Sequence, residues 1–133
     1  LYKHGKSFGF PDVSIGKLKD VLDVGLNAID IAKNNGVKIG HGSDLLGECQ
    51  MYQSDELSIK AEVVGNYEAI RHATEVNAEI LNMTNELGVI KENSLADILI
   101  VDGNPLKDIG FLNNDAKFIP IIMKDGVFYK NVL

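Results

Sequence analysis

The stretch that decides the fold is Val37–Gly47, which reads VKIGHGSDLLG. Its first four residues, Val37–Gly40, are mainly apolar, as expected for a short parallel strand that is covered on both faces. Two glycines then flank His41, and the carboxylate of Asp44 follows in a loop bounded by Gly47. In βα-barrels the chemistry lies just beyond the carboxyl ends of the strands. We therefore predict an α/β fold in which this stretch delivers Asp44.

A helix is predicted upstream of the strand. Pro11 and Asp12 favour a helix start, and Gly36 is suited to the left-handed residue that ends one. Gly16 and Gly25 interrupt the pattern, so one long helix and two shorter ones are both compatible with it. The spacing of three and four residues predicts one apolar face. Its members are Ile15, Leu18, Leu22, Leu26 and Ile29.

Two further helices are predicted downstream, after a polar loop over residues 48–53. Ser54, Asp55 and Glu56 favour the start of a short helix through residue 64. Gly65 should end it, and Asn66 could cap a second helix over residues 67–81. The predicted packing face of this second helix consists of Ile70, Ala73, Asn77, Ile80 and Leu81.

The pattern changes to β-type beyond Gly88. Short runs rich in β-branched residues predict strands at residues 98–101, 119–123 and 127–129. Asp125-Gly126 between the last two runs predicts a hairpin, because a tight two-residue turn needs positive φ. We therefore divide the chain into a helical part, residues 1–86, and a β-rich part, residues 87–133.

Composition excludes several classes of protein. The formal charge of −6 and the lack of a basic cluster argue against a nucleic-acid partner. No apolar run is long enough to span a bilayer, so no membrane partner is expected. The single cysteine, Cys49, rules out an internal disulfide and is compatible with the cytoplasm. With 133 residues beginning at a leucine, the chain is too short for a complete barrel and suggests a missing N-terminus.

Three sequence blocks, in a fixed order, resemble the metal-dependent amidohydrolase superfamily, in particular its imidazolonepropionase-like and Xaa-Pro dipeptidase (prolidase) branch. They are GVKIGHGSDLLGE, AIRHATEVNAEIL, and ADILIVDGNPLKDI followed by IPIIMKDGVFYKN. The resemblance implies the last βα unit or units of a TIM-type (β/α)8 barrel plus the C-terminal strands of a composite β-sandwich. The chain would thus be an incomplete fragment of the full fold, its C-terminal portion.

The resemblance also implies a role for Asp44. By spacing alone, a Ser-Asp pair after a strand is more often a helix cap or an Asx turn. In the superfamily, the matching carboxylate is a ligand of a divalent metal, expected to be zinc with one or two ions. It also shuttles the proton as a metal-bound hydroxide attacks an amide. Leu45, Leu46 and Gly47 follow it and are weak candidates for substrate binding.

The sequence departs from the superfamily pattern at two places. Asn93 stands where relatives usually have glycine before the Ala-Asp pair, and asparagine tolerates the same left-handed turn. The His-x-His metal-binding pair is absent, since the only histidines are His4, His41 and His72. We assign no role to His4, expect His41 to pack against the site without binding metal, and place His72 at the surface or half-buried. The missing ligands would come from strands that precede this chain.

Three functions are compatible with the sequence. The first is a hydrolase of dipeptides or N-acyl amino acids, active as a full-length homo-oligomer. The second is an imidazolonepropionase-like hydrolase of cyclic amides, because fold-level analogy cannot choose the substrate. The third is a non-catalytic folding or association module, because the chain has one expected metal ligand. Cys49 is expected to be a buried or half-buried bystander, and the other loop acids to be turn or strand-edge residues: Asp97, Asp102 and Asp125.

Overall fold

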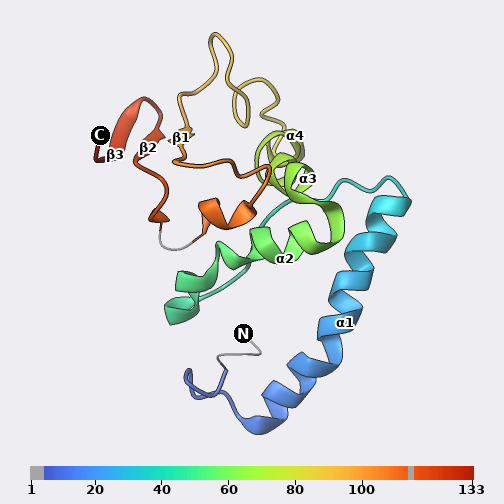
Figure 1. Ribbon diagram of the computed structural model, residues 1–133. Helices are drawn as coiled ribbons and strands as arrows, with labels where there is room; N and C mark the ends of the chain where they lie inside the picture. The colour runs from blue at the N-terminus through green and yellow to red at the C-terminus, as the bar shows by residue number, and fades with distance from the viewer. Residues whose placement is uncertain (1–4, 114–115) are drawn as a thin grey trace.

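The computed structural model describes residues 5–113 and 116–133, and shows a helical half followed by a small sheet (Figure 1). The helices are α1 (Asp12–Asn34), the 3-10 helix η1 (Gly47–Tyr52), α2 (Asp55–Val64), α3 (Asn66–Arg71), the π-helical η2 (His72–Val76), α4 (Asn77–Ile80) and the 3-10 helix η3 (Ile109–Leu112). The strands are β1 (Ile98–Ile100), β2 (Ile121–Lys124) and β3 (Val127–Asn131).

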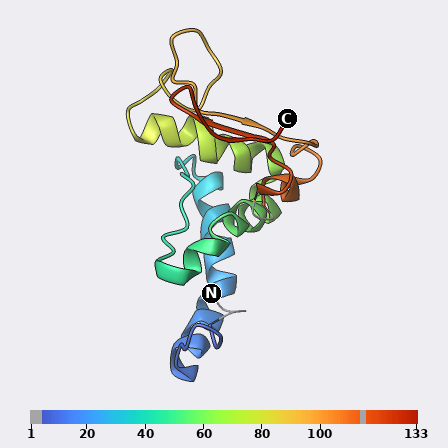
Figure 2. The same cartoon turned by 90° about the vertical axis from the view of Figure 1, so that its left-hand side faces the viewer.

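Helix α1 is one continuous helix that reaches away from the rest of the chain in both views (Figures 1 and 2). Gly16 and Gly25 do not break it, since a glycine inside a helix costs only about 1 kcal/mol and the flanking residues sustain it. The predicted end is confirmed, with Gly36 at a φ of 67°. The predicted apolar face is half-buried except for Leu22, which is 47% exposed.

The strand predicted at Val37–Gly40 is wrong. Residues 37–46 have no regular secondary structure, and no described residue forms a β-ladder with them. An apolar run creates a strand only when a second backbone supplies hydrogen bonds, and the sequence pattern of one segment does not reveal that partner. The polar loop predicted at residues 48–53 is also corrected, because most of it belongs to η1.

The next two predicted helices are confirmed. Helix α2 begins at Asp55 as expected, and Gly65 ends it with a φ of 84°. The second helix is built from α3, η2 and α4, with a π turn in its middle. Asn66 is not its cap, since it is the first helical residue and its amide donates to the carbonyl of Leu106 at 3.2 Å. This side chain therefore joins the helix to the loop after β1.

The packing face predicted for this second helix is partly wrong. Its most buried positions carry small residues, Ala69 at 0% and Ala78 at 3% exposure, whereas Ile80 is 48% exposed and Leu81 63% exposed. Small side chains permit the closest approach of neighbouring backbone. The π turn also adds a residue to one turn, which rotates the face that follows it.

The β-rich part is confirmed as an antiparallel sheet in the order β1-β2-β3. The second strand begins at Ile121, two residues later than predicted, and a register irregularity lies between Ile122 and Met123. Lys124 pairs with Val127, which leaves Asp125 and Gly126 as the two turn residues, with φ of 47° and 74°. These values fit the predicted hairpin turn.

The buried core of the described residues is small. Buried apolar side chains are few, and no large side chain in the described ranges is fully buried. Large apolar residues stay exposed along α1 and the sheet, for example Val24 at 64% and Tyr129 at 75%. Among the helices that the structure describes, none has the length and apolarity needed to cross a membrane.

Candidate active-site loop

Residues 37–46, the extended segment, connect α1 to η1 without regular secondary structure. Asp44 lies near the end of this segment. Its side chain is exposed, and it makes no hydrogen bond to any described residue. Its backbone has a φ of 50°, in the left-handed region that few residues other than glycine occupy, although aspartate is among those that tolerate it. The carboxylate is therefore available to bind a ligand, and the backbone at this residue is held in an uncommon conformation.

The three residues after Asp44 lead into η1. Leu45 is half-buried, and its backbone N–H donates to the hydroxyl of Ser43 at 3.5 Å. Leu46 is 77% exposed, and Gly47 has a φ of 56°. The loop therefore exposes an apolar side chain two residues after Asp44, which is compatible with the predicted role in substrate binding.

The segment that leads to Asp44 is held by side chains from two helices. Asn77 of α4 accepts from the N–H of His41 and donates to the carbonyl of the same residue, both at 2.9 Å. Lys60 of α2 donates to the carbonyl of Gly40 at 2.6 Å. Glu56, also in α2, accepts from the N–H of Gly42 at 3.3 Å. Sequence reasoning missed all three side chains as parts of the site.

A weak signal for these residues exists in the sequence. Asn77 is the one amide on the predicted apolar face of its helix, and a polar group on such a face needs a partner. Glu56 and Lys60 are spaced by four residues, and their side chains approach to 3.3 Å. Such a spacing usually indicates an exposed surface pair. Only the fold shows that Lys60 is buried.

His41 lies beside the same cluster. Its side chain is 19% exposed, and Nδ1 lies 3.7 Å from Oε1 of Glu56. Burial lowers the pKa of His41 below 6.5, Glu56 opposes this shift, and Lys60 adds to it. The packing role predicted for His41 therefore agrees with its position, and the ring is favoured in its neutral form.

The other candidate residues that the structure describes are buried or hydrogen-bonded within the fold. His72 was expected at the surface or half-buried, but it is buried with 9% exposure, and burial lowers its pKa below 6.5. Cys49 is buried, as expected. Asp97 accepts from the N–H of Asp125 at 2.7 Å, which confirms a role at the strand edge and turn. His4 lies outside the described residues.

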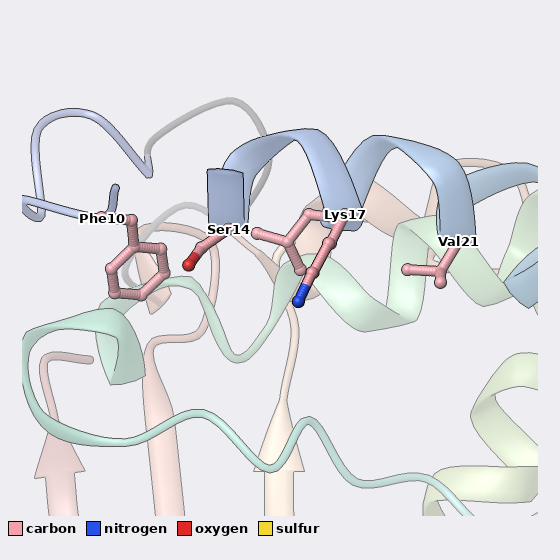
Figure 3. A pocket seen from close by; sticks show the side chains of 5 residues that line it. Phe10, Ser14, Lys17 and Val21 are labelled. Carbon is pink, nitrogen blue, oxygen red and sulfur yellow. The ribbon is translucent and has the colours of Figure 1, made fainter. Parts of the chain in front are cut away.

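Two hollows flank the helical part. One, of about 420 Å³, lies at the start of α1 (Figure 3), and its lining offers no carboxylate, imidazole or thiol. It is lined by Phe10, Ser14, Lys17, Leu18 and Val21. The other, of about 230 Å³, lies along the extended segment and includes His72 and Glu79 in its lining. Neither hollow includes Asp44.

The described residues contain no group of three or more histidine, cysteine or acidic side chains that could hold a metal ion. A complete metal site is therefore not formed by the described part of this chain. Asp44 fits as a single ligand, because its oxygens are exposed and without partners among the described residues.

Comparison with known proteins identifies relatives. The sequence matches the amidohydrolase family over residues 1–127. It is similar to the solved structure of an amidohydrolase, with 48% identity and a TM-score of 0.92 over 100% of this chain and 32% of that one. It is also similar to a prolidase in complex with N-methylphosphonate-L-proline, with 45% identity and a TM-score of 0.91 over 99% of this chain and 32% of that one.

A third similar structure is more distant. It is a Xaa-Pro dipeptidase with bound methionine in its active site, with 30% identity and a TM-score of 0.77. The alignment covers 92% of this chain and 29% of that one. The chain therefore spans about a third of the length of the solved structures it matches. No curated protein matches it significantly.

Proposed function

Because the chain belongs to the amidohydrolase family, we propose that it is the C-terminal part of a hydrolase of amide or peptide C–N bonds. The observation that carries the proposal is Asp44, an exposed carboxylate held at positive φ on a loop whose approach is anchored by two helices. In this proposal, residues 1–86 complete a barrel and residues 87–133 belong to a β-sandwich. The exposed apolar side chains of α1 and the sheet support the view that further polypeptide covers them.

Asp44 would serve as one ligand of a divalent metal. Zinc is the expected ion, and the other ligands would come from outside this chain. When bound, such an ion supplies a Lewis acid that polarises the scissile carbonyl and acidifies the attacking water. The chain's own contribution is Asp44, whose free carboxylate oxygen can accept a proton from that water and return it to the leaving amine.

The substrate that best fits is a dipeptide or an N-acyl amino acid. A structure 45% identical to this chain is that of a prolidase in complex with N-methylphosphonate-L-proline, and a structure 30% identical is that of a Xaa-Pro dipeptidase. The exposed Leu46, two residues after Asp44, offers an apolar contact that suits an uncharged side chain or ring of such a substrate. A homo-oligomer also stays a prediction for the complete protein.

The test is Asp44→Asn in the complete enzyme. Asparagine tolerates positive φ, so the fold should survive, while the loss of a basic oxygen should lower kcat about a hundredfold to ten-thousandfold. The matched control is Asp125→Asn, because Asp125 is also an exposed aspartate at positive φ, with a φ of 47°. Steady-state kinetics with Xaa-Pro dipeptides would measure both variants. Unchanged turnover in Asp44→Asn would exclude the proposed role.

Metal analysis separates this proposal from the non-catalytic alternative. The complete enzyme should contain a divalent metal, and Asp44→Asn should lower its occupancy. This chain alone, with one candidate ligand, should bind zinc weakly in a calorimetric titration. Tight stoichiometric binding by the isolated chain would show that its ligands lie elsewhere.

A further inference from the structure

We propose that Asn77, with Lys60 and Glu56, is a positioning residue that sets the place of Asp44 through the backbone of residues 40–42. This inference rests on the proposed function, because it assigns these residues a role only if Asp44 acts in the reaction. None of the three side chains needs to contact substrate. Each contacts the backbone that carries the acid.

The contacts satisfy consecutive backbone groups. The carbonyl of Gly40 accepts from Lys60, and the N–H of Gly42 donates to Glu56. Between them, the backbone N–H and C=O of His41 both bind the side-chain amide of Asn77. A neighbouring strand would normally bind such groups. Here side chains of two helices replace a strand on one side of the segment, and this fixes both its position and its orientation.

The amide of Asn77 is the most specific of these contacts. It pairs with the N–H and the carbonyl of one residue, at 2.9 Å each, which requires both its oxygen and its nitrogen in one orientation. The approach is close enough that a Cβ on Gly40 would lie 2.7 Å from Oδ1 of Asn77 and 3.0 Å from Cδ1 of Ile80. A side chain at position 40 would therefore collide with α4, and glycine permits this close approach.

The lysine contact is unusual because the charge is buried. Lys60 is 3% exposed, and its ammonium lies 2.6 Å from the carbonyl of Gly40 and 3.3 Å from Glu56. A buried ammonium is stable only with such partners. Oε1 of Glu56 in turn binds Gly42, so the ion pair links α2 to both ends of the anchored tripeptide.

The hydrogen-bonded residues 40–42, the anchor of this loop, lie close to Asp44 along the chain. Gly42 and Asp44 are separated by one residue, and each residue extends a chain by at most about 3.6 Å. A displaced anchor therefore displaces the carboxylate. A shift of about 1 Å at a reacting group can lower the rate about a hundredfold.

The experiment is a double-mutant cycle in the complete enzyme. Asn77→Ala should lower kcat about tenfold to a hundredfold and leave KM nearly unchanged. In the Asp44→Asn background the same change should have little further effect, because Asn77 acts through Asp44. Asn77→Asp is the second variant, since it keeps the size of the side chain and the acceptor for His41 N–H but loses the donor to His41 C=O. It places a carboxylate oxygen against the carbonyl oxygen of His41, so it should lower kcat at least as much as Asn77→Ala.

The matched control is Asn66→Ala. Asn66 belongs to the same helical run and also donates to a backbone carbonyl, but that carbonyl belongs to Leu106, at 3.2 Å, and not to residues 40–44. It should leave kcat unchanged. Full activity in both Asn77 variants, or an Asn77→Ala loss that adds fully to that of Asp44→Asn, would overturn the positioning role. If Asp44→Asn left turnover unchanged, the proposed function itself would be rejected.

Discussion

Two regions of this chain that begin with a short apolar run, the β2–β3 hairpin and residues 37–44, are held in opposite ways. The β2–β3 hairpin is stabilised by its own backbone, with paired strands and a two-residue turn. The segment 37–44 pairs with no described strand and is fixed by side chains from α2 and α4. The hairpin therefore depends on local sequence, and the segment depends on the correct placement of two helices. Substitutions and changes of pH should therefore affect these two kinds of support differently.

The largest effect on stability is expected at Gly88, where the β-rich part begins. Gly88 and Gly126 both have a φ of 74°, but a Cβ on Gly88 would lie 2.5 Å from the backbone of Thr74, whereas one on Gly126 would meet nothing. Gly88→Ala should cost about 2 to 5 kcal/mol, since strain and overpacking add. Gly126→Ala should cost about 1 to 2 kcal/mol, from the backbone strain alone. Denaturant unfolding measures both, and equal losses would contradict the packing argument.

The next effect compares two lysines that each contact a carboxylate. The side chain of Lys60 is 4% exposed beside Glu56, and that of Lys124 is 65% exposed at 2.9 Å from Asp97. Lys60→Met should destabilise the protein by about 2 to 3 kcal/mol, because it leaves the carbonyl of Gly40 without its donor and the partly buried Glu56 without its cationic partner. Lys124→Met should cost less than about 1 kcal/mol, as for other exposed pairs. Unfolding free energies that do not differ would show that burial of Lys60 has no consequence.

The smallest effect is a dependence of the unfolding free energy on pH, which the two histidines of the helical part cause. Burial is the main cause that lowers the pKa of both His41 and His72 below 6.5 in the folded state. As the pH falls below 6.5, the unfolded chain takes up protons before the folded one does. The unfolding free energy is therefore full above pH 6.5 and decreases as the pH falls toward the lowered folded values.

The charged groups around these histidines set the size of that effect. Lys60 lowers the pKa of both rings, while Glu56 raises that of His41 and Glu68 raises that of His72. Arg71 also lowers the pKa of His72, as does His41 itself. His41→Gln should flatten the decline in unfolding free energy just below pH 6.5. An unfolding free energy that does not decrease as the pH falls below 6.5 would contradict this assignment.

The hairpin should respond at a different pH. The N–H of Asp125, and then Lys124, hold the pKa of Asp97 below 3.8. The contribution of Asp97 is thus present above pH 3.8 and is lost as the pH falls through its lowered folded value. Mild acid should shift the NMR amide signal of Gly42 while leaving that of Gly126 in place. Simultaneous shifts would show that the two regions are coupled.

Local chemistry made much of the fold predictable. The start of α1 after Pro11, the break at Gly65, and the hairpin turn at Asp125-Gly126 were all confirmed. The left-handed turn expected where Asn93 replaces glycine was confirmed as well, with a φ of 67°. In each case one residue's allowed backbone conformations fix the outcome, whatever lies elsewhere in the chain.

The site was less predictable because its support is not local. Asp44 was a prediction from the sequence, and its catalytic role stays one. Asn77 gives only a weak signal, as the one amide on a predicted packing face, and Lys60 and Glu56 have the spacing of an ordinary surface pair. Their function depends on which backbone lies opposite, and that is decided when residues far apart in the chain meet.

The sequence by itself determined the start of α1, the break at Gly65 and the hairpin turn at Asp125-Gly126, since backbone sterics act within a few residues. It also determined that the carboxylate of Asp44 follows an apolar run. Only the tertiary structure decided that this run is unpaired with any described strand and that Asn77, Lys60 and Glu56 hold it. Hydrogen-bond partners are chosen by distance in space, and a linear pattern does not contain that distance.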